Sequence, residues 1–358
     1  MQIAKCTVFL ISGMTLSSSL LFAAEQVVAP AHADSGLAWY DASDIGVEGK
    51  GWQDTEKYYD RLPARAKGIV RDPVWYLSHD AAGLCVRFAT DAPSVVVSWD
   101  GCSDGEGGMP HMADTGNSGV DLYVKRDGKW KFVRVAFPQD EWTVCTLIED
   151  WVPERREYLM YLSLYDPVQK LEIGIPGDSQ LWRVPKPKGK PVLFYGTSIT
   201  QGGCASRPGM VHTAILGRWL DREIINLGFS GNGMMEPEMA EFVGELDPAI
   251  LLISHDNVGN KVGELLEPFV EIFRRKHPDL PILLMESHLP FHAEANRILT
   301  DAWRRMMNAG DENIYLIKAT KDCFLEGEAT VDGVHPTDLG FLLRAKWLKG
   351  PLGMMLKR

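Results

Sequence analysis

Ser198 is the first residue of this sequence with a position suited to chemistry. It lies where the apolar run "PVLFYG" gives way to "TSITQGG". A serine at the end of a buried strand can present its hydroxyl at the rim of a sheet, where the N–H groups of the following turn can face a carbonyl oxygen. Serine and threonine are also favoured as turn and cap residues, and we expect Thr197 and Thr200 to shape the turn. The position of Ser198 alone is therefore compatible with either role, a nucleophile or a turn or cap residue.

A base for this serine is offered near the far end of the chain, in "TVDGVHPTDLG". His335 could take the proton from Ser198, and Asp332 could orient the imidazole and stabilise its protonated form. A single histidine before proline is more often a surface loop residue. The presence of Asp332 three residues earlier favours the catalytic interpretation.

A glycine-rich segment, "NLGFSGNG", follows another apolar run at residues 226–233. Glycine lets a backbone N–H come close to a substrate oxygen, so Gly231 could supply a second donor for an oxyanion. A phosphate-binding loop is excluded, because neither G-x-G-x-x-G nor G-K-[ST] occurs there.

The elements that must position these residues differ between the two halves of the chain. Residues 36–184 contain short alternating runs and an Asp127-Gly128 hairpin signal, which predict an all-β, jelly-roll-like sandwich domain. After the Pro- and Lys-rich stretch "RVPKPKGKP", short continuous apolar runs alternate with amphipathic stretches over residues 190–358, including an expected helix at about 209–220. This pattern predicts an α/β domain with a doubly wound parallel sheet, in which ligands bind at the carboxyl ends of the strands.

Composition narrows the class of partner. The 358 residues are 45% hydrophobic and carry a net charge of −11. Clusters of Lys and Arg interleaved with aromatic residues are absent from the sequence, so we expect no nucleic-acid partner and favour a neutral or weakly charged ligand. The six cysteines show no C-x-x-C spacing, which leaves a structural zinc site unsupported. Either one disulfide among Cys85, Cys102 and Cys145 or buried free thiols fit the sequence.

The N-terminus carries Lys5 and then an apolar stretch from about residue 7 to residue 24. This pattern indicates a signal peptide, residues 1–24, with cleavage after Ala24 or as late as Ala33. Because Gly13 and the serines at 17–19 dilute the stretch, cleavage is favoured over a membrane anchor. We therefore expect an exported protein, periplasmic or extracellular, that has no stable membrane insertion after cleavage.

The combination of motifs resembles the SGNH (GDSL-type) hydrolases, in particular their two-domain branch with an N-terminal "GxDLY" sandwich. The matching segments are "YGTSITQGG" for the nucleophile, "NLGFSGNG" for the oxyanion glycine, "DGVHPTDLG" for the acid and base, and "GVDLY" at 119–123. Arg207 in "CASRPGM" also matches the branch and is taken as a substrate-binding candidate. The resemblance implies a flavodoxin-like catalytic domain, no cofactor and no catalytic metal, and hydrolysis of esters, often acetyl groups on carbohydrates.

One block departs from the family pattern. After the third strand the family has Gly-x-Asn-Asp, and this chain has "SHDNVGN". Asn257 is the nearest candidate for a further oxyanion donor and Asn260 the next. His255 and Asp256 could be substrate contacts, although solvated loop residues would be the commoner outcome.

The function predicted from these observations is a secreted serine esterase that removes acyl groups, most plausibly acetyl, from carbohydrates or other small esters. Two alternatives stay open: a carbohydrate-binding protein on a weakened hydrolase scaffold, and a lipase or thioesterase. The tryptophans of the sandwich could stack on sugar rings, with core packing expected for most of them: Trp99, Trp130, Trp142 and Trp151. The sequence leaves the oligomeric state open.

Overall fold

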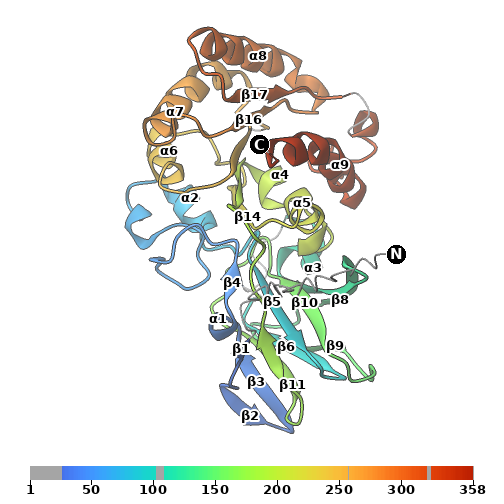
Figure 1. Cartoon of the computed structure of the whole chain (residues 1–358). Helices are drawn as coiled ribbons and strands as arrows, with labels where there is room; N and C mark the ends of the chain where they lie inside the picture. The colour runs from blue at the N-terminus through green and yellow to red at the C-terminus, as the bar shows by residue number, and fades with distance from the viewer. Residues whose placement is uncertain (1–25, 102–108, 257, 321–323, 358) are drawn as a thin grey trace, which may run out of the picture.

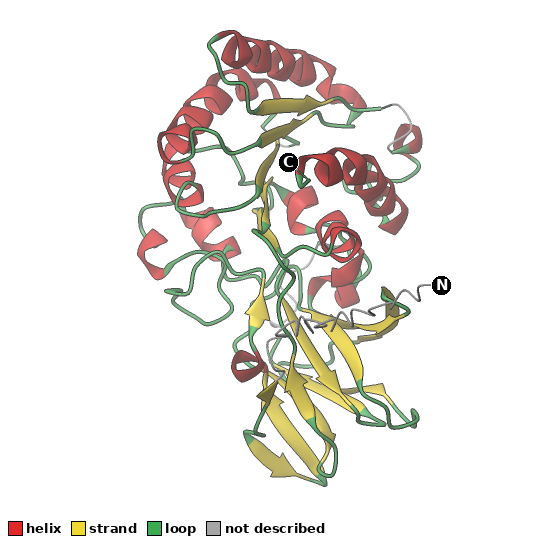
Figure 2. Ribbon diagram, in the orientation of Figure 1, coloured by secondary structure: helices red, strands yellow, loops and turns green. Residues whose placement is uncertain are grey.

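The computed structural model describes residues 26–101, 109–256, 258–320 and 324–357. A β-sandwich forms from the first half of the chain, and a parallel sheet covered by helices on both faces forms from the second half (Figure 1, Figure 2). The predicted fold class is confirmed. The expected signal peptide, Asn257, Cys102 and Cys323 lie outside the described residues.

The sandwich consists of two antiparallel sheets. One has the order β1 (Gln26–Val27), β12 (Leu181–Arg183), β5 (Cys85–Thr90), β10 (Arg156–Tyr161), β7 (Val120–Arg126) and β8 (Lys129–Ala136), with β4 (Val47–Glu48) also paired to β5. The other has the order β2 (His32–Asp34), β3 (Leu37–Asp41), β11 (Leu171–Pro176), β6 (Val95–Trp99) and β9 (Thr143–Ile148). Two short helices, α1 (Ala42–Ile45) and α3 (Asp114–Asn117), complete this part of the chain.

The hairpin predicted at Asp127-Gly128 joins β7 to β8. Both turn residues have positive φ, 52° and 69°, as a two-residue turn between antiparallel strands requires. Of the four tryptophans considered, Trp99 is fully buried and Trp142 is exposed. The pattern of alternating residues thus predicted this part of the sandwich well.

The parallel sheet has the order β14 (Ile224–Gly228), β13 (Val192–Gly196), β15 (Ile250–Ser254), β16 (Ile282–Met285) and β17 (Ile314–Ile317). In chain order this is 2-1-3-4-5, the flavodoxin-like arrangement. Its longer helices are α5 (His212–Leu220), α6 (Pro237–Val243), α7 (Val262–Lys276), α8 (Ala293–Asn308) and α9 (Asp338–Met355). The single turn α4 (Ser198–Gln201) and the 3-10 turns η2 (Pro208–Met210), η3 (Gly259–Lys261), η4 (Pro290–His292) and η5 (Leu325–Gly327) lie in the connections. The helix expected at about 209–220 is therefore divided into η2 and α5.

Alternate residues of the strands face opposite layers of helices. In β13, Leu193 and Tyr195 join the core formed with α6, α7 and α8, whereas Val192 and Phe194 join the core formed with α5 and α9. Both faces are buried, which explains why the strands of this domain appear in the sequence as continuous apolar runs. Among the described residues, no helix is both long enough and apolar enough to cross a bilayer.

Residues 49–83, here called the strap, contain no strand of the sandwich, although the sequence placed them in the strand-rich half. They contain η1 (Ala64–Ala66) and α2 (Asp72–Leu77), and they pack on the α6 side of the parallel sheet (Figure 1). Tyr59 and Ala81 pack in the sandwich core. Six other apolar residues of the strap are part of the core on the α6 side: Trp52, Leu62, Ala66, Val70, Val74 and Trp75. Hydrogen bonds from Trp52 Nε1 to Glu245 (2.9 Å) and from the backbone N–H of Gly49 to Glu223 (2.9 Å) fix the strap further.

Candidate active site

Ser198 is the first residue of α4 and directly follows the end of β13 and Thr197. β13 lies between β14 and β15, so Ser198 lies at the point where the strand order of the sheet reverses. Ligands of doubly wound sheets bind outside the carboxyl ends of the strands at this point. Topology therefore brings the hydroxyl of a serine to the expected place for a ligand.

Ser198, His335 and Asp332 form one hydrogen-bonded chain. His335 Nε2 lies 2.9 Å from Ser198 Oγ, and His335 Nδ1 lies 2.8 Å from Asp332 Oδ2. Asp332 and His335 come from the loop that precedes α9, and this loop reaches back across the sheet to Ser198. The three residues have the geometry in which an imidazole can take a proton from a serine hydroxyl while a carboxylate orients the ring.

The Asp332 carboxylate is held by several donors. Its Oδ1 accepts the backbone N–H of Val334 (2.9 Å) and of His335 (2.7 Å). Partial burial by itself would raise the pKa of Asp332, but the hydrogen bonds from the His335 side chain and from these two amides outweigh it and lower the pKa. Asp332 is therefore ionised at neutral pH and able to stabilise a protonated His335.

The glycine-rich segment lies beside α4. Gly231 is exposed and has a φ of +67°, a left-handed conformation that favours glycine. The preceding residue is fixed by the nucleophile's own helix, because the Ser230 N–H donates to Gln201 Oε1 (2.8 Å). Gly231 thus follows a residue that α4 positions, which suits it to offer an N–H to an oxyanion.

A buried polar network that sequence reasoning missed supports this arrangement. Gln201 Nε2 donates to Asp80 Oδ2 (2.8 Å) and to the carbonyl of Leu164 (3.1 Å). Arg61 donates to the carbonyls of Asp80 (2.8 Å) and Gly228 (2.6 Å). Burial raises the pKa of Asp80 to about 7, although Arg61 and Gln201 oppose the rise. The strap therefore supplies two charged residues that hold the glycine-rich segment against α4.

The loop after the third strand differs from the expectation. His255 and Asp256 are buried, whereas solvated loop residues were the commoner expectation. His255 Nε2 pairs with Asn296 Oδ1 (2.9 Å), and Asp256 forms an ion pair with the fully buried Arg344 of α9 (2.8 Å). A carboxylate buried at this depth needs such a partner, and no local pattern in the sequence announced it. Asn257 is outside the described residues, and Asn260 is exposed in η3.

Arg207, taken from the sequence as a substrate-binding candidate, is engaged at the boundary between the domains. Its Nη1 lies 2.8 Å from Asp121 Oδ2, it also donates to the hydroxyl of Tyr123, and its guanidinium lies 3.7 Å from the centre of the Phe132 ring. Asp121, the aspartate of "GVDLY", is fully buried and also accepts the N–H of Gly209 (3.1 Å). The contacts of Arg207 join the sandwich to the catalytic domain, and its substrate-binding role stays a prediction.

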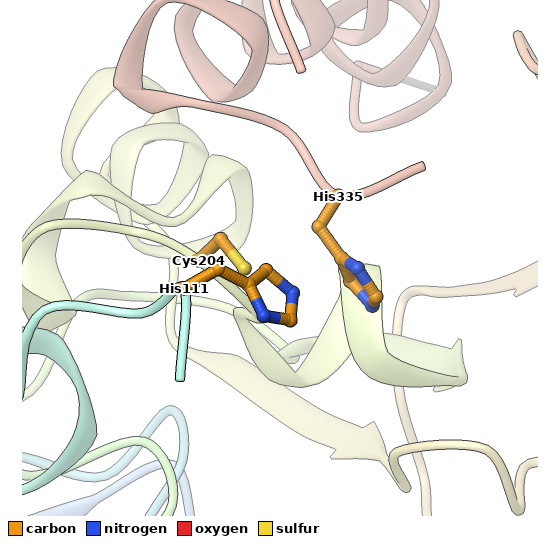
Figure 3. A group of neighbouring side chains, drawn as sticks. All are labelled: His111, Cys204 and His335. Carbon is orange, nitrogen blue, oxygen red and sulfur yellow. The ribbon is translucent and has the colours of Figure 1, made fainter. Parts of the chain in front are cut away.

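Two further residues lie beside the triad. His111, from the sandwich half, places its Nε2 3.2 Å from Asp332 Oδ2. Cys204 follows Gly202 and Gly203, and a Cβ on Gly203 would lie 2.9 Å from the Tyr165 hydroxyl and 3.0 Å from His335 Cδ2, so glycine lets this segment pack closely beside the base. Figure 3 shows His111, Cys204 and His335 converging from three separate segments. His111 was missed because a single histidine in "GMPHMAD" carries no signal of its own.

Comparison with known families agrees with the architecture. The GxDLY model, which describes the N-terminus of SGNH-hydrolase-type esterases, matches residues 37–181, and the GDSL-like lipase/acylhydrolase model matches residues 189–350. No curated protein sequence matches the chain.

Solved structures give three informative likenesses. A protein from Bacteroides ovatus ATCC 8483, named only as a candidate GDSL-like lipase, is 32% identical with a TM-score of 0.84, over 90% of this chain and 98% of that one. The salicylyl-acyltransferase SsfX3 of a tetracycline biosynthetic pathway is 16% identical with a TM-score of 0.67, over 92% and 97%. An acetyl xylan esterase from the rumen bacterium Butyrivibrio proteoclasticus is 14% identical with a TM-score of 0.57, over 89% and 99%. The last two likenesses concern the fold.

The two family matches, together with 32% identity to a GDSL-like structure over nine-tenths of this chain, decide the family. The chain belongs to the GDSL-like (SGNH) hydrolases, with a GxDLY domain at its N-terminus, and is an ester hydrolase.

Proposed function

We propose that this protein is an exported serine esterase that removes acetyl groups from carbohydrates through Ser198, His335 and Asp332. The observation that carries the proposal is the position of His335, which lies within hydrogen-bond distance of both the Ser198 hydroxyl and the Asp332 carboxylate. A carbohydrate substrate is supported by the likeness to an acetyl xylan esterase and by the net charge of −11, which does not favour an anionic ligand.

The reaction follows from this geometry. His335 takes the Ser198 proton as Oγ attacks the ester carbonyl, and the backbone N–H groups of Ser198 and Gly231 stabilise the negative charge that develops on the carbonyl oxygen. His335 then gives the proton to the departing sugar hydroxyl, which leaves an acetyl group on Ser198. Water, deprotonated by His335, attacks this acyl-enzyme, and acetate leaves as Ser198 regains its proton.

The test is acetate release from acetylated xylan and turnover of p-nitrophenyl acetate. Ser198→Ala and His335→Ala should each lower kcat by at least about a thousandfold, since the members of such a triad act as a unit. Matched controls are Ser35→Ala, on the exposed edge of the sandwich, and His32→Ala, whose ring pairs with Glu172. Normal turnover by Ser198→Ala would overturn the proposal, and an inert wild type that still binds the polysaccharide would favour the carbohydrate-binding alternative.

The acyl group is tested separately. We expect turnover to fall as the acyl chain of a p-nitrophenyl ester is lengthened from acetate to octanoate. A preference for the long chain would favour the lipase alternative, and a preference for acyl thioesters over oxygen esters would favour the thioesterase.

Export is part of the proposal, and the fold favours one cleavage site. β2 (His32–Asp34) pairs with β3, and β1 pairs with β12. Cleavage after Ala33 would cut β2 and remove β1, whereas cleavage after Ala24 leaves both strands intact. N-terminal sequencing of the mature protein should therefore begin at Glu25, and a start at Asp34 would contradict this site.

A further inference from the structure

Three potential metal ligands meet beside the triad. The ligand atoms of His111, Cys204 and His335 all lie within 4.8 Å of one another. Figure 3 shows their side chains pointing toward a common space, one from the sandwich half, one from the loop after α4 and one from the loop before α9. The three ligands are far apart along the chain, so no motif in the sequence indicated a metal site.

We propose that His111, Cys204 and His335 form a zinc site that inhibits the esterase. Two imidazoles and one thiolate are ligands that Zn²⁺ prefers. Side-chain movements of about 1 Å would bring the two ring nitrogens and the sulfur to the mutual separations found in a tetrahedral zinc site. The fourth position is open to water or to Asp332, whose Oδ2 lies 3.2 Å from His111 Nε2. The half-exposed side chain of His111 leaves an entry path for the ion.

Inhibition follows from the two ring nitrogens of His335. One nitrogen contacts Ser198 and the other contacts Asp332, so both are already used by the triad. Zinc on Nε2 would separate the base from the serine, and zinc on Nδ1 would separate it from the carboxylate. Whichever nitrogen binds the ion, the base no longer works as the triad requires.

The backbone of Cys204 supports a dedicated role for this residue. Cys204 is a buried free cysteine with a φ of 72°, in the left-handed region that few residues other than glycine and asparagine adopt. Such conformations are concentrated at functional sites. Zinc would replace the thiol proton and bind the sulfur as a thiolate.

Calorimetric titration of the tag-free protein with ZnCl₂ tests the site without relying on turnover. We expect one zinc ion per chain, and affinity weakened by more than about tenfold in His111→Ala and in Cys204→Ser. Cys204→Gly, which suits the positive φ, should behave like Cys204→Ser and guards against misfolding. Cys145→Ser and His32→Ala are the matched controls, and both should bind zinc as wild type does. Co²⁺ in place of Zn²⁺ should give a thiolate charge-transfer band that Cys204→Ser lacks.

The inhibitory consequence rests on the proposed function, and its readout is separate. Zinc should lower turnover of p-nitrophenyl acetate by wild type, and excess chelator should restore it, whereas Cys204→Ser should need at least about tenfold more zinc. Wild type and Cys204→Ser with the same zinc affinity, or wild type with no calorimetric signal, would overturn the site. A zinc-free wild type without turnover would overturn the proposed esterase instead, and calorimetry would still decide the zinc site.

Discussion

Replacement of Gln201 by methionine is expected to damage catalysis without touching any reacting atom. Gln201 is fully buried and lies three residues after Ser198 in α4. Its side chain accepts the Ser230 N–H and donates to Asp80 and to the Leu164 carbonyl. Methionine has a similar volume but makes none of these hydrogen bonds, so the substitution isolates the polar network from the packing.

The magnitude follows from the three hydrogen bonds. The bond to Asp80 is worth about 2 kcal/mol and the two neutral ones about 1 kcal/mol each, so the free energy of unfolding should fall by about 4 kcal/mol. The Ser230 N–H then loses its acceptor, and the adjacent Gly231 is no longer held in position. Misplacement of an oxyanion donor should lower kcat by about tenfold to a hundredfold, with KM nearly unchanged.

Steady-state kinetics with p-nitrophenyl acetate and urea unfolding measure the two effects. Gln169→Met, at an exposed position of the sandwich half, is the matched control and should change neither quantity. The reasoning fails if Gln201→Met keeps the kcat of wild type while its free energy of unfolding falls as expected. That result would show that the network stabilises the fold without positioning the glycine-rich segment.

Three further predictions concern other parts of the structure. Because the pKa of Asp80 is raised to about 7, the folded protein holds the proton of this carboxyl more tightly than the unfolded chain does. The resulting contribution to the free energy of unfolding is complete below about pH 4 and is lost as the pH rises toward 7, by up to about 4 kcal/mol. Asp80→Asn should remove this part of the pH dependence in urea unfolding, and a pH profile identical to that of wild type would contradict the buried carboxyl. Asp121→Asn leaves Arg207 without its carboxylate and should lower the free energy of unfolding by about 3 to 5 kcal/mol. Glu157→Gln, which breaks the half-exposed pair with Lys125, should lower it by less than about 1 kcal/mol. Equal losses in urea unfolding would refute the buried ion pair between Asp121 and Arg207. Gly231→Ala should lower the free energy of unfolding by about 1 kcal/mol, because alanine is strained at the positive φ of this residue. It should also lower kcat with little change in KM, and unaltered kinetics would place the oxyanion donor elsewhere.

The sequence predicted those features that have a local or motif-based signal. The Asp127-Gly128 turn and the continuous apolar strands follow from patterns within a few residues, whereas the flavodoxin-like arrangement of the parallel sheet was implied by the resemblance to a known family. Ser198 and His335 could be chosen because each lies in a short motif at a strand end or a turn-rich loop, and the structure brings their side chains together.

The features that were missed depend on contacts between distant segments. The strap was assigned to the strand-rich half because nothing within residues 49–83 tells that Trp52 and Trp75 pack on a sheet formed much later in the chain. Arg344 and Asp256 pair across 88 positions, and Arg207 and Asp121 across 86. Charged residues found singly in a sequence look like surface residues, and only the fold shows that they are buried with a partner.

The strap also sets the order in which this protein can be completed during synthesis. Its residues leave the ribosome before the strands and helices on which they pack, since domains emerge from the N-terminus onward. The sandwich strands can pair once β12 has been made, but Trp52, Leu62 and Trp75 keep their apolar surfaces exposed until β14 and α6 follow. A chain cut in the stretch between residues 184 and 190 would therefore yield one fragment with an uncovered apolar segment and another with an uncovered core. Although two sheets and two sequence patterns suggest separable halves, the molecule becomes complete only when its C-terminal half has been made.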